Sequence, residues 1–265
     1  PQPRADDDHD VFLIAGYHHT HAPLAVAALQ RGAYAVVEKP VAVTREQLGS
    51  LQAAVSEARA GFFACFHKRY SPLNDFALQD LRQPPGAPID YHCIVYEVPL
   101  PELHWYRWPN SKSRLVSNGC HWLDHFLYVN GFSEVRSLDL GASPAGVIHC
   151  SVTLENGAYF TMVLTDKGSE RIGLQEYVEL RAEQVTVKIV NNATYMAEDR
   201  DRVIRRARIN KMLPYKRMYR RIAEQIARGE GGDSLQSVRV STGLVLDLEA
   251  RLEQLSAEGG GILRS

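Results

Sequence analysis

Short apolar runs alternate with helix-forming segments in the first quarter of the chain, and this alternation restricts the fold more than any other feature. Three runs have the length and composition of buried strands, and they are residues 11–16, 33–38 and 62–66. One helix-forming segment follows Pro23 and ends at Gly32, and another begins at Thr44 and ends near Gly61. Successive strands joined by helices pair in parallel through right-handed crossovers. The sequence therefore predicts a parallel α/β array over residues 1–66.

The pattern changes after residue 84, where longer segments alternate between apolar and polar residues. This alternation is typical of strands with one buried face, and it occurs at 89–98, 135–141, 146–154, 158–164 and 177–190. Helices are expected at 114–130, 215–228 and 234–257. The predicted fold class is α/β, with a parallel-sheet domain over residues 1–66 and an α+β domain with a large, mainly antiparallel sheet over residues 67–265.

Composition excludes several classes of protein. The 265 residues are 45% hydrophobic with a formal net charge of -1, so the whole chain has no attraction for nucleic acid or an anionic membrane. Its apolar runs fall far short of the ~20 residues that a membrane span needs, and the acidic stretch from Pro1 to Asp10 is unlike a signal peptide. The cysteines form no C-x-x-C pair. We expect a cytoplasmic protein that binds a small molecule, and no metal, nucleic acid or membrane.

The predicted helix at 114–130 gathers short polar side chains on one face, and they are Ser117, Asn118, His121, Asp124 and His125. A solvated face is usually filled with Lys, Glu and Arg, so this composition favours a cleft, with a solvated face as the alternative. His121 is the candidate proton donor and acceptor, and Asp124 is expected to orient it or to raise its pKa. His125 either binds a substrate hydroxyl or completes a hydrogen-bond network.

Polar residues also follow the first two predicted strands. Tyr17, His18 and His21 come after the first strand, and Glu38 and Lys39 come after the second. The carboxyl ends of parallel strands lie at one edge of the sheet, where open α/β sheets bind their ligands. A metal site is the alternative, because imidazoles are common zinc ligands, but no nearby carboxylate or cysteine completes a set of four. This edge is therefore predicted to bind a nucleotide.

Three segments resemble motifs of the Gfo/Idh/MocA family of oxidoreductases, which includes glucose-fructose oxidoreductase and inositol dehydrogenase. They are Glu38-Lys39-Pro40, Lys68-Arg69-Tyr70-Ser71-Pro72 and Gly119-Cys120-His121-Trp122-Leu123-Asp124. Their order and spacing are more specific than any one of them alone, and the resemblance extends over nearly the whole chain. It implies a partial Rossmann domain over residues 1–66, followed by a substrate-binding and oligomerisation domain over residues 67–265.

The resemblance also implies a reaction and the residues that carry it. The expected activity is transfer of hydride between NAD or NADP and a hydroxyl-bearing carbon of a sugar, a polyol or a nucleotide-linked sugar. His121 corresponds to the catalytic acid/base, and Lys39 to the lysine beside the nicotinamide ribose and the reacting hydroxyl. The residues implied in the cofactor site are Tyr17, His18, His21, Glu38, Lys39 and Arg69. Those implied in the substrate site are Arg114, Ser117, Asn118, Asp124 and His125.

Two departures from the family pattern keep other functions open. Many members carry an aspartate where this chain has Ser117. A complete member begins with a Gly-rich phosphate-binding turn, whereas the pattern G-x-G-x-x-G does not occur in this sequence. We therefore expect that the chain lacks the front of the Rossmann domain and needs that segment to bind its cofactor. The alternatives are a non-catalytic sugar-binding or scaffold relative, and a glycosidase that uses NAD transiently.

The segment from Arg200 to Arg221 is dense in Lys and Arg and is interleaved with tyrosines. Acidic residues elsewhere balance its charge, and no nucleic-acid motif accompanies it, so binding of nucleic acid is disfavoured. A solvated face or a subunit contact is the favoured interpretation, and binding of a phosphorylated or nucleotide-linked substrate is the alternative. Exposed sheet surface in the second domain favours a homo-oligomer, either a dimer or a tetramer.

Overall fold

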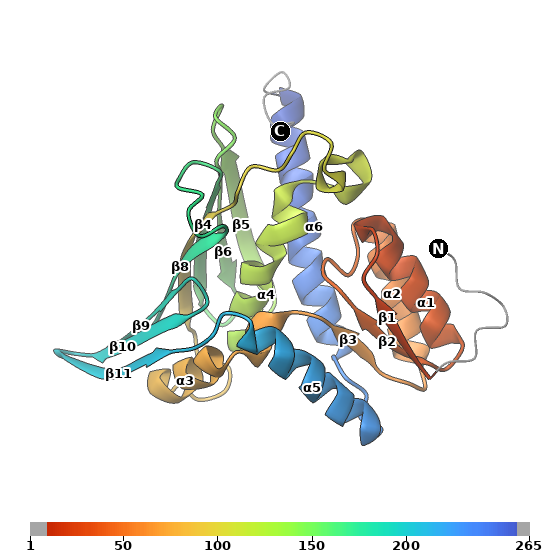
Figure 1. Ribbon diagram of the computed structural model, residues 1–265, viewed down its shortest axis with the longest axis horizontal. Coiled ribbons are helices and arrows are strands. Elements are labelled where there is room, and N and C mark those ends of the chain that lie inside the picture. Colours follow the sequence, from red (N-terminus) through yellow and green to blue (C-terminus); the bar gives the residue numbers. More distant parts are fainter. Residues whose placement is uncertain (1–9, 259–265) are drawn as a thin grey trace.

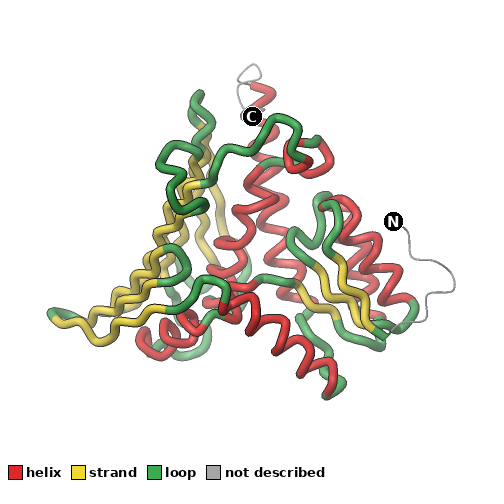
Figure 2. Tube along the Cα trace, viewed as in Figure 1, coloured by secondary structure: helices red, strands yellow, loops and turns green. Residues whose placement is uncertain are grey.

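The computed structural model describes residues 10–258; residues 1–9, which hold most of the acidic stretch that is unlike a signal peptide, and residues 259–265 lie outside the described part. Two sheets stand on opposite sides of the molecule with helices between them (Figure 1, Figure 2). One sheet has three strands and the other eight. No helix within residues 10–258 combines the length and the apolar character needed to cross a membrane. The predicted fold class is confirmed, because a small parallel sheet precedes a large, mainly antiparallel one.

The small sheet has the predicted parallel pairing. Its strands pair in chain order, and they are β1 (Val11–Ile14), β2 (Tyr34–Val37) and β3 (Phe62–Ala64). Two helices connect them, α1 (His21–Gln30) and α2 (Arg45–Glu57). Successive side chains of a strand point to opposite faces. Ala35 and Val37 therefore pack in the main core that α1 and α2 share, whereas Val36 packs in a second cluster on the other face.

Local signals explain where the two connecting helices begin. Before α2, the side chain of Thr44 accepts a hydrogen bond from the backbone N–H of Gln47 at 3.1 Å, which is the predicted cap. The predicted start of α1 at Pro23 is late, because the helix begins at His21. Proline is tolerated there, since the first turn of a helix leaves its N–H groups unpaired.

The large sheet has the strand order β11-β10-β9-β8-β4-β7-β6-β5. All neighbours are antiparallel except the pair β4 and β7. The strands are β4 (Asp90–Tyr96), β5 (Val135–Ala142), β6 (Ile148–Leu154), β7 (Tyr159–Thr165), β8 (Gln175–Ala182), β9 (Val185–Val190), β10 (Thr194–Asp199) and β11 (Arg202–Arg208). The strands β4, β5, β6 and β7 lie close to predicted strands. The prediction of a single strand at 177–190 is wrong, because this segment contains both β8 and β9. The chain turns there between β8 and β9, at Glu183 with φ 49°.

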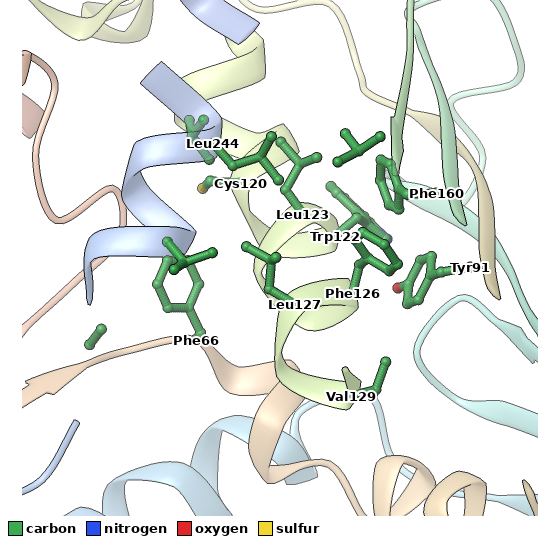
Figure 3. Packing of buried hydrophobic residues seen from close by; sticks show 14 of the residues in the cluster. Phe66, Tyr91, Cys120, Trp122, Leu123, Phe126, Leu127, Val129, Phe160 and Leu244 are labelled. Carbon is green, nitrogen blue, oxygen red and sulfur yellow. The ribbon is translucent and has the colours of Figure 1, made fainter. Parts of the chain in front are cut away.

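One helix packs against the inner face of the large sheet. This is α4 (Cys120–Val129), and the ring of its Phe126 lies 5.1 Å from Phe160 and 6.3 Å from Tyr91 between ring centroids (Figure 3). Every residue of α4 except Tyr128 is buried. The alternative of a solvated polar face is therefore wrong, and the polar side chains of this helix lie inside the protein.

Two further helices join the two sheets. The long α6 (Leu235–Glu258) contacts α4 and β5 on one side and α2 on the other (Figure 1). Helix α5 (Leu213–Ala227) covers the second face of the small sheet, where its Met218 and Ile222 pack with Val36. Residues 213–227 thus belong to the core of the small sheet, although the predicted division at residue 66 assigns them to the second domain.

The turn between α5 and α6 runs beside β3. The backbone N–H of Phe62 donates to Gly231 O at 3.2 Å, and the N–H of Asp233 donates to Phe62 O at 2.7 Å. A Cβ at Gly232 would lie 2.3 Å from Phe62 O, so only glycine allows this approach. The chain therefore returns to the small sheet before α6 crosses to the large one.

Candidate active site

Polar residues follow all three parallel strands. Tyr17 and His18 follow β1, Lys39 follows β2, and His67 follows β3. Because the strands are parallel, these residues lie at one edge of the sheet. His67 is absent from the predicted set, yet its place after the third apolar run is a signal that the sequence does contain.

Lys39 connects this edge to the segment that precedes α4. Its Nζ donates to the backbone carbonyl of Ser117 at 2.8 Å. Ser117 lies in a π-helical turn (Leu115–Gly119) that leads directly into α4. The ammonium group also lies 5.8 Å from the centroid of the Tyr106 ring. This contact holds a cation beside the first turn of α4, where His121 lies.

His121 is buried, with 7% of its surface exposed. Its ring makes T-shaped contacts with the rings of Phe66, His67 and Trp122. Its Nδ1 is buried and has no hydrogen-bond partner among residues 10–258. Burial, and after it the charge of Lys39, hold the pKa of His121 well below its usual range. The imidazole is therefore neutral at neutral pH, which is the form that accepts a proton.

A second buried imidazole lies beside the first. The centroid of the His67 ring is 4.7 Å from that of His121, with the two planes at 69°. Its other side stacks on Tyr215 of α5 at 4.1 Å and 15°. Its Nδ1 is likewise buried without a partner in the described part of the chain. Burial lowers the pKa of His67 well below its usual range, so this ring is also neutral.

Asp124 and Arg69 form a buried ion pair. Arg69 donates from Nε and Nη2 to the two carboxylate oxygens of Asp124, at 2.8 and 2.5 Å, and from Nη1 to Asp233 at 2.5 Å. Ser241 Oγ donates to the same carboxylate at 2.6 Å. The prediction that Asp124 raises the pKa of His121 is wrong, because that pKa is lowered and both carboxylate oxygens are engaged elsewhere. Arg69, predicted in the cofactor site, links α4 to the turn before α6.

His125 belongs to a buried hydrogen-bond network, the second of the two roles predicted for it. Its Nδ1 lies 3.1 Å from the hydroxyl of Tyr91, and its Nε2 lies 3.0 Å from Oδ1 of Asn74. Burial lowers the pKa of His125 to about 3. With both ring nitrogens in contact with protein groups, this imidazole has none free for a substrate hydroxyl.

The histidines after β1 hold loops together. The ring nitrogens of His21 lie 2.7 Å from Pro40 O and 3.0 Å from Gly16 O, so this ring joins the ends of β1 and β2. His18 lies with Nδ1 3.3 Å from Ser111 O, and its pKa falls to about 3 because it is buried. The two rings lie 6.0 Å apart between centroids, but no group of three His, Cys, Asp or Glu within residues 10–258 could hold a metal ion.

Tyr17 and Glu38 complete the predicted cofactor edge. The ring of Tyr17 is 44% exposed and packs against Trp105 and Trp108, with 5.3 Å between centroids in both pairs. Glu38 Oε1 accepts a hydrogen bond from the hydroxyl of Tyr219 at 2.7 Å. Tyr17 thus offers an open aromatic surface, and Glu38 is fixed by α5.

The residues predicted in the substrate site meet a carboxylate that is absent from the predicted set. Asn118 Nδ2 donates to Glu97 Oε1 at 2.5 Å, and Arg114 Nε lies 3.7 Å from Glu97 Oε2. Arg114 also donates to the carbonyl of Leu164 at 3.3 Å. Burial raises the pKa of Glu97, against the effects of Asn118, Arg114 and Lys39. Its place just after β4 is the sequence signal that could have revealed it.

This edge fits the nicotinamide end of a dinucleotide. The exposed ring of Tyr17 provides a flat apolar surface, and Lys39 with the unpaired nitrogen of His121 provides polar groups. Ligand sites combine an apolar lining with a few such polar groups. The donor set therefore suits a flat, polar heterocycle beside a hydroxyl.

Comparison with known proteins agrees with the resemblance seen in the sequence. Residues 3–65 match the family model described as the Gfo/Idh/MocA oxidoreductase family, NAD-binding Rossmann fold. Over this segment, the match agrees with the predicted family and nicotinamide cofactor class. No curated protein matches the chain in sequence.

Several solved structures share the fold. A dehydrogenase from Chromobacterium violaceum has a TM-score of 0.76 and 13% identity, over 96% of this chain and 80% of that chain. Levoglucosan dehydrogenase in complex with NADH and levoglucosan has a TM-score of 0.75 and 17% identity, over 91% and 78% of the two chains. The WlbA dehydrogenase from Thermus thermophilus, in complex with NAD and UDP-GlcNAcA, has a TM-score of 0.69 and 16% identity, over 92% and 73%.

Proposed function

We propose that this chain, whose residues 3–65 match the family model of the Gfo/Idh/MocA oxidoreductases, oxidises or reduces a hydroxyl-bearing carbon of a sugar, a polyol or a nucleotide-linked sugar with NAD or NADP. The observation that carries this proposal is the contact between Lys39 Nζ and Ser117 O. It holds an ammonium group beside a buried, neutral imidazole at the ligand-binding edge of a parallel sheet. The neighbours solved with levoglucosan and with a nucleotide-linked sugar support the substrate class.

In this function His121 accepts the hydroxyl proton of the substrate when an alcohol is oxidised. Its lowered pKa keeps it neutral, so the base form is present over the whole neutral range. Lys39 stabilises the negative charge that develops on the same oxygen, because its position is fixed before the reaction. The nicotinamide, when bound, supplies the group that takes up or gives the hydride.

The test is a screen of sugars, polyols and nucleotide-linked sugars with NAD+ and with NADP+, followed by nicotinamide absorbance. At least one substrate is expected to give reduced cofactor. We expect His121→Asn to lower kcat about 10²- to 10⁴-fold, which is the usual contribution of an acid/base residue. His149→Asn, at the exposed position of β6, is the matched control and should retain activity. Absence of reduction with every substrate, under conditions where calorimetric titration shows that NAD+ or NADP+ binds, would contradict the proposal.

The outer face of the large sheet supports the predicted homo-oligomer. Ile94 of β4 is 58% exposed, and its register partner Tyr177 of β8 is 63% exposed. Tyr159, at the start of neighbouring β7, is 41% exposed. We propose that a second copy of the chain covers these apolar side chains, because exposed clusters of this kind mark contact surfaces.

A further inference from the structure

His67 and His121 form a pair of buried imidazoles whose hydrogen bonds are incomplete. Only 5% of His67 and 7% of His121 are exposed, and the Nδ1 atoms of both lack a partner within residues 10–258. Buried polar groups in proteins nearly always have a hydrogen-bond partner. The two rings are 4.7 Å apart between centroids, which is close enough for one bound molecule to supply both missing partners.

The packing holds His67 firmly in this position. It begins the short helical turn after β3 (His67–Tyr70), and its ring stacks on Tyr215 at 4.1 Å. Burial raises the pKa of Tyr215 to about 12, so the stacked phenol stays neutral. His67 is therefore fixed from both sides, by its own backbone turn and by α5, without using its ring nitrogens.

The charge state of the pair selects the chemistry of the ligand. Burial lowers the pKa of both rings, and the positive charge of nearby Lys39 lowers both further. A neutral imidazole has one N–H donor and one acceptor nitrogen. A hydroxyl group is also both donor and acceptor, so it matches either nitrogen, whereas a carboxylate or phosphate only accepts. The pair thus suits hydroxyl groups better than anions.

We propose that His67 is a second substrate-binding residue, which binds the hydroxyl next to the one that His121 and Lys39 act on, so that the substrate is a vicinal diol. The proposal rests on the proposed function. A hydrogen bond spans about 2.8 Å, so two rings whose centroids lie 4.7 Å apart can each reach one of two hydroxyls on adjacent carbons. His67 thereby selects substrates by their second hydroxyl.

The test measures binding directly, by long-range 1H–15N NMR of the histidine side chains of the whole chain. The probes are trans-cyclohexane-1,2-diol, cyclohexane-1,4-diol and cyclohexanol. We expect the 1,2-diol to shift the ring signals of both His67 and His121, and cyclohexanol to shift His121 alone. One added hydrogen bond corresponds to roughly tenfold tighter binding of the 1,2-diol than of cyclohexanol. The 1,4-diol should bind like cyclohexanol.

Three variants separate this role from a structural one. His67→Phe keeps an aromatic ring against Tyr215 and should remove the tenfold preference for the 1,2-diol, while cyclohexanol still shifts His121. His67→Asn, whose amide both donates and accepts, should restore part of the preference. His149→Phe, at the exposed position of β6, should leave the preference unchanged.

Two results would overturn the inference in different ways. If His67→Phe keeps the full preference, or if the 1,2-diol shifts His121 alone, His67 does not bind substrate although the proposed function stands. If none of the three alcohols shifts His121, the alcohol site itself is wrong and the proposed function fails with this inference.

Discussion

Four of the five buried histidines within residues 10–258 fall into two groups according to what their ring nitrogens contact. Both nitrogens of His21 and of His125 contact protein groups, which makes these residues parts of the framework. His67 and His121 have a buried Nδ1 without a partner among the described residues. Burial lowers the pKa of all four. The roles proposed for His67 and His121 therefore rest on their missing hydrogen bonds and their contact with each other, and not on the pKa shift.

Burial of neutral histidines makes the stability of the protein depend on pH. The pKa of His125 is about 3 in the folded chain and about 6.5 in an unfolded one. The unfolded chain therefore binds more protons below pH 6.5, so stability is complete above that pH and is lost as the pH falls toward 3. Between pH 6.5 and 5.5 this one residue should lower the free energy of unfolding by about 1 kcal/mol.

Urea unfolding of wild type and His125→Gln at these two pH values checks the prediction. The variant should lose about 1 kcal/mol less than wild type over the interval. His149→Gln, an exposed histidine on β6, serves as the control and should behave as wild type. Equal losses in wild type and His125→Gln would contradict the pKa shift.

Residue types at the site could be predicted from the sequence, but their partners could not. The carboxyl ends of β1 and β2 identify Tyr17 and Lys39 as edge residues, and a helical wheel identifies the polar face of α4. The wheel cannot show that Arg69, distant in sequence, takes the carboxylate of Asp124. For the same reason it could not exclude His125, whose partners Asn74 and Tyr91 come from other elements.

Among the elements, the buried ion-pair cluster of Arg69 joins three segments. It connects the turn after β3 with α4 through Asp124, and with the turn before α6 through Asp233. The side chain of Arg69 is 6% exposed and that of Asp124 is 0% exposed. Removal of one partner of a buried pair leaves the other charge without compensation, which costs about 3–5 kcal/mol.

We therefore expect Arg69→Leu to lower the free energy of unfolding by about 3–5 kcal/mol. The matched control is Arg181→Leu, whose ion pair with Glu179 has an arginine side chain that is 59% exposed. Exposed pairs contribute less than about 1 kcal/mol, so this control should change little. Denaturant titration of both variants checks the difference, and similar losses in the two would refute a special role for the buried cluster.

Several parts of the fold were not predicted from apolar patterning. The turn between β8 and β9 has Glu183 in the left-handed region, and the sequence offers no Gly or Asn there as a signal. β11 lies at one edge of the large sheet and is rich in arginine. Charged residues are common in edge strands, so this sequence resembles a solvated segment. α3 (Pro72–Leu81) begins after Ser71, whose side chain caps the helix by accepting a hydrogen bond from the N–H of Leu73 at 3.2 Å.

At the scale of the whole molecule, the site depends on contact between the two halves of the chain. Lys39 comes from the small sheet, His121 from the helix that packs on the large one, and Tyr215 from α5. α6 contacts both halves and holds them together. The site therefore forms only when both sheets and their shared helices have assembled.

The outer face of the large sheet should govern assembly. We expect wild type to be a dimer or tetramer and Ile94→Asp to have a smaller mass, because a charge on this face opposes its burial by a second copy. Leu103→Asp is the control, since Leu103 is 91% exposed in a loop outside both sheets. Light scattering after size exclusion measures the masses. A monomeric wild type, or an unchanged mass in Ile94→Asp, would contradict the proposed interface.

The most direct test of the central claim follows deuterium from substrate to cofactor. A sugar or polyol that reduces the nicotinamide is labelled on the carbon that bears the reacting hydroxyl and incubated with wild type and with His121→Asn. The account predicts that wild type transfers one deuterium to the reduced nicotinamide for each ketone formed, and that the variant does so about 10²- to 10⁴-fold more slowly. Deuterium that returns to the sugar without net cofactor reduction, or a rate unaffected by His121→Asn, would contradict it.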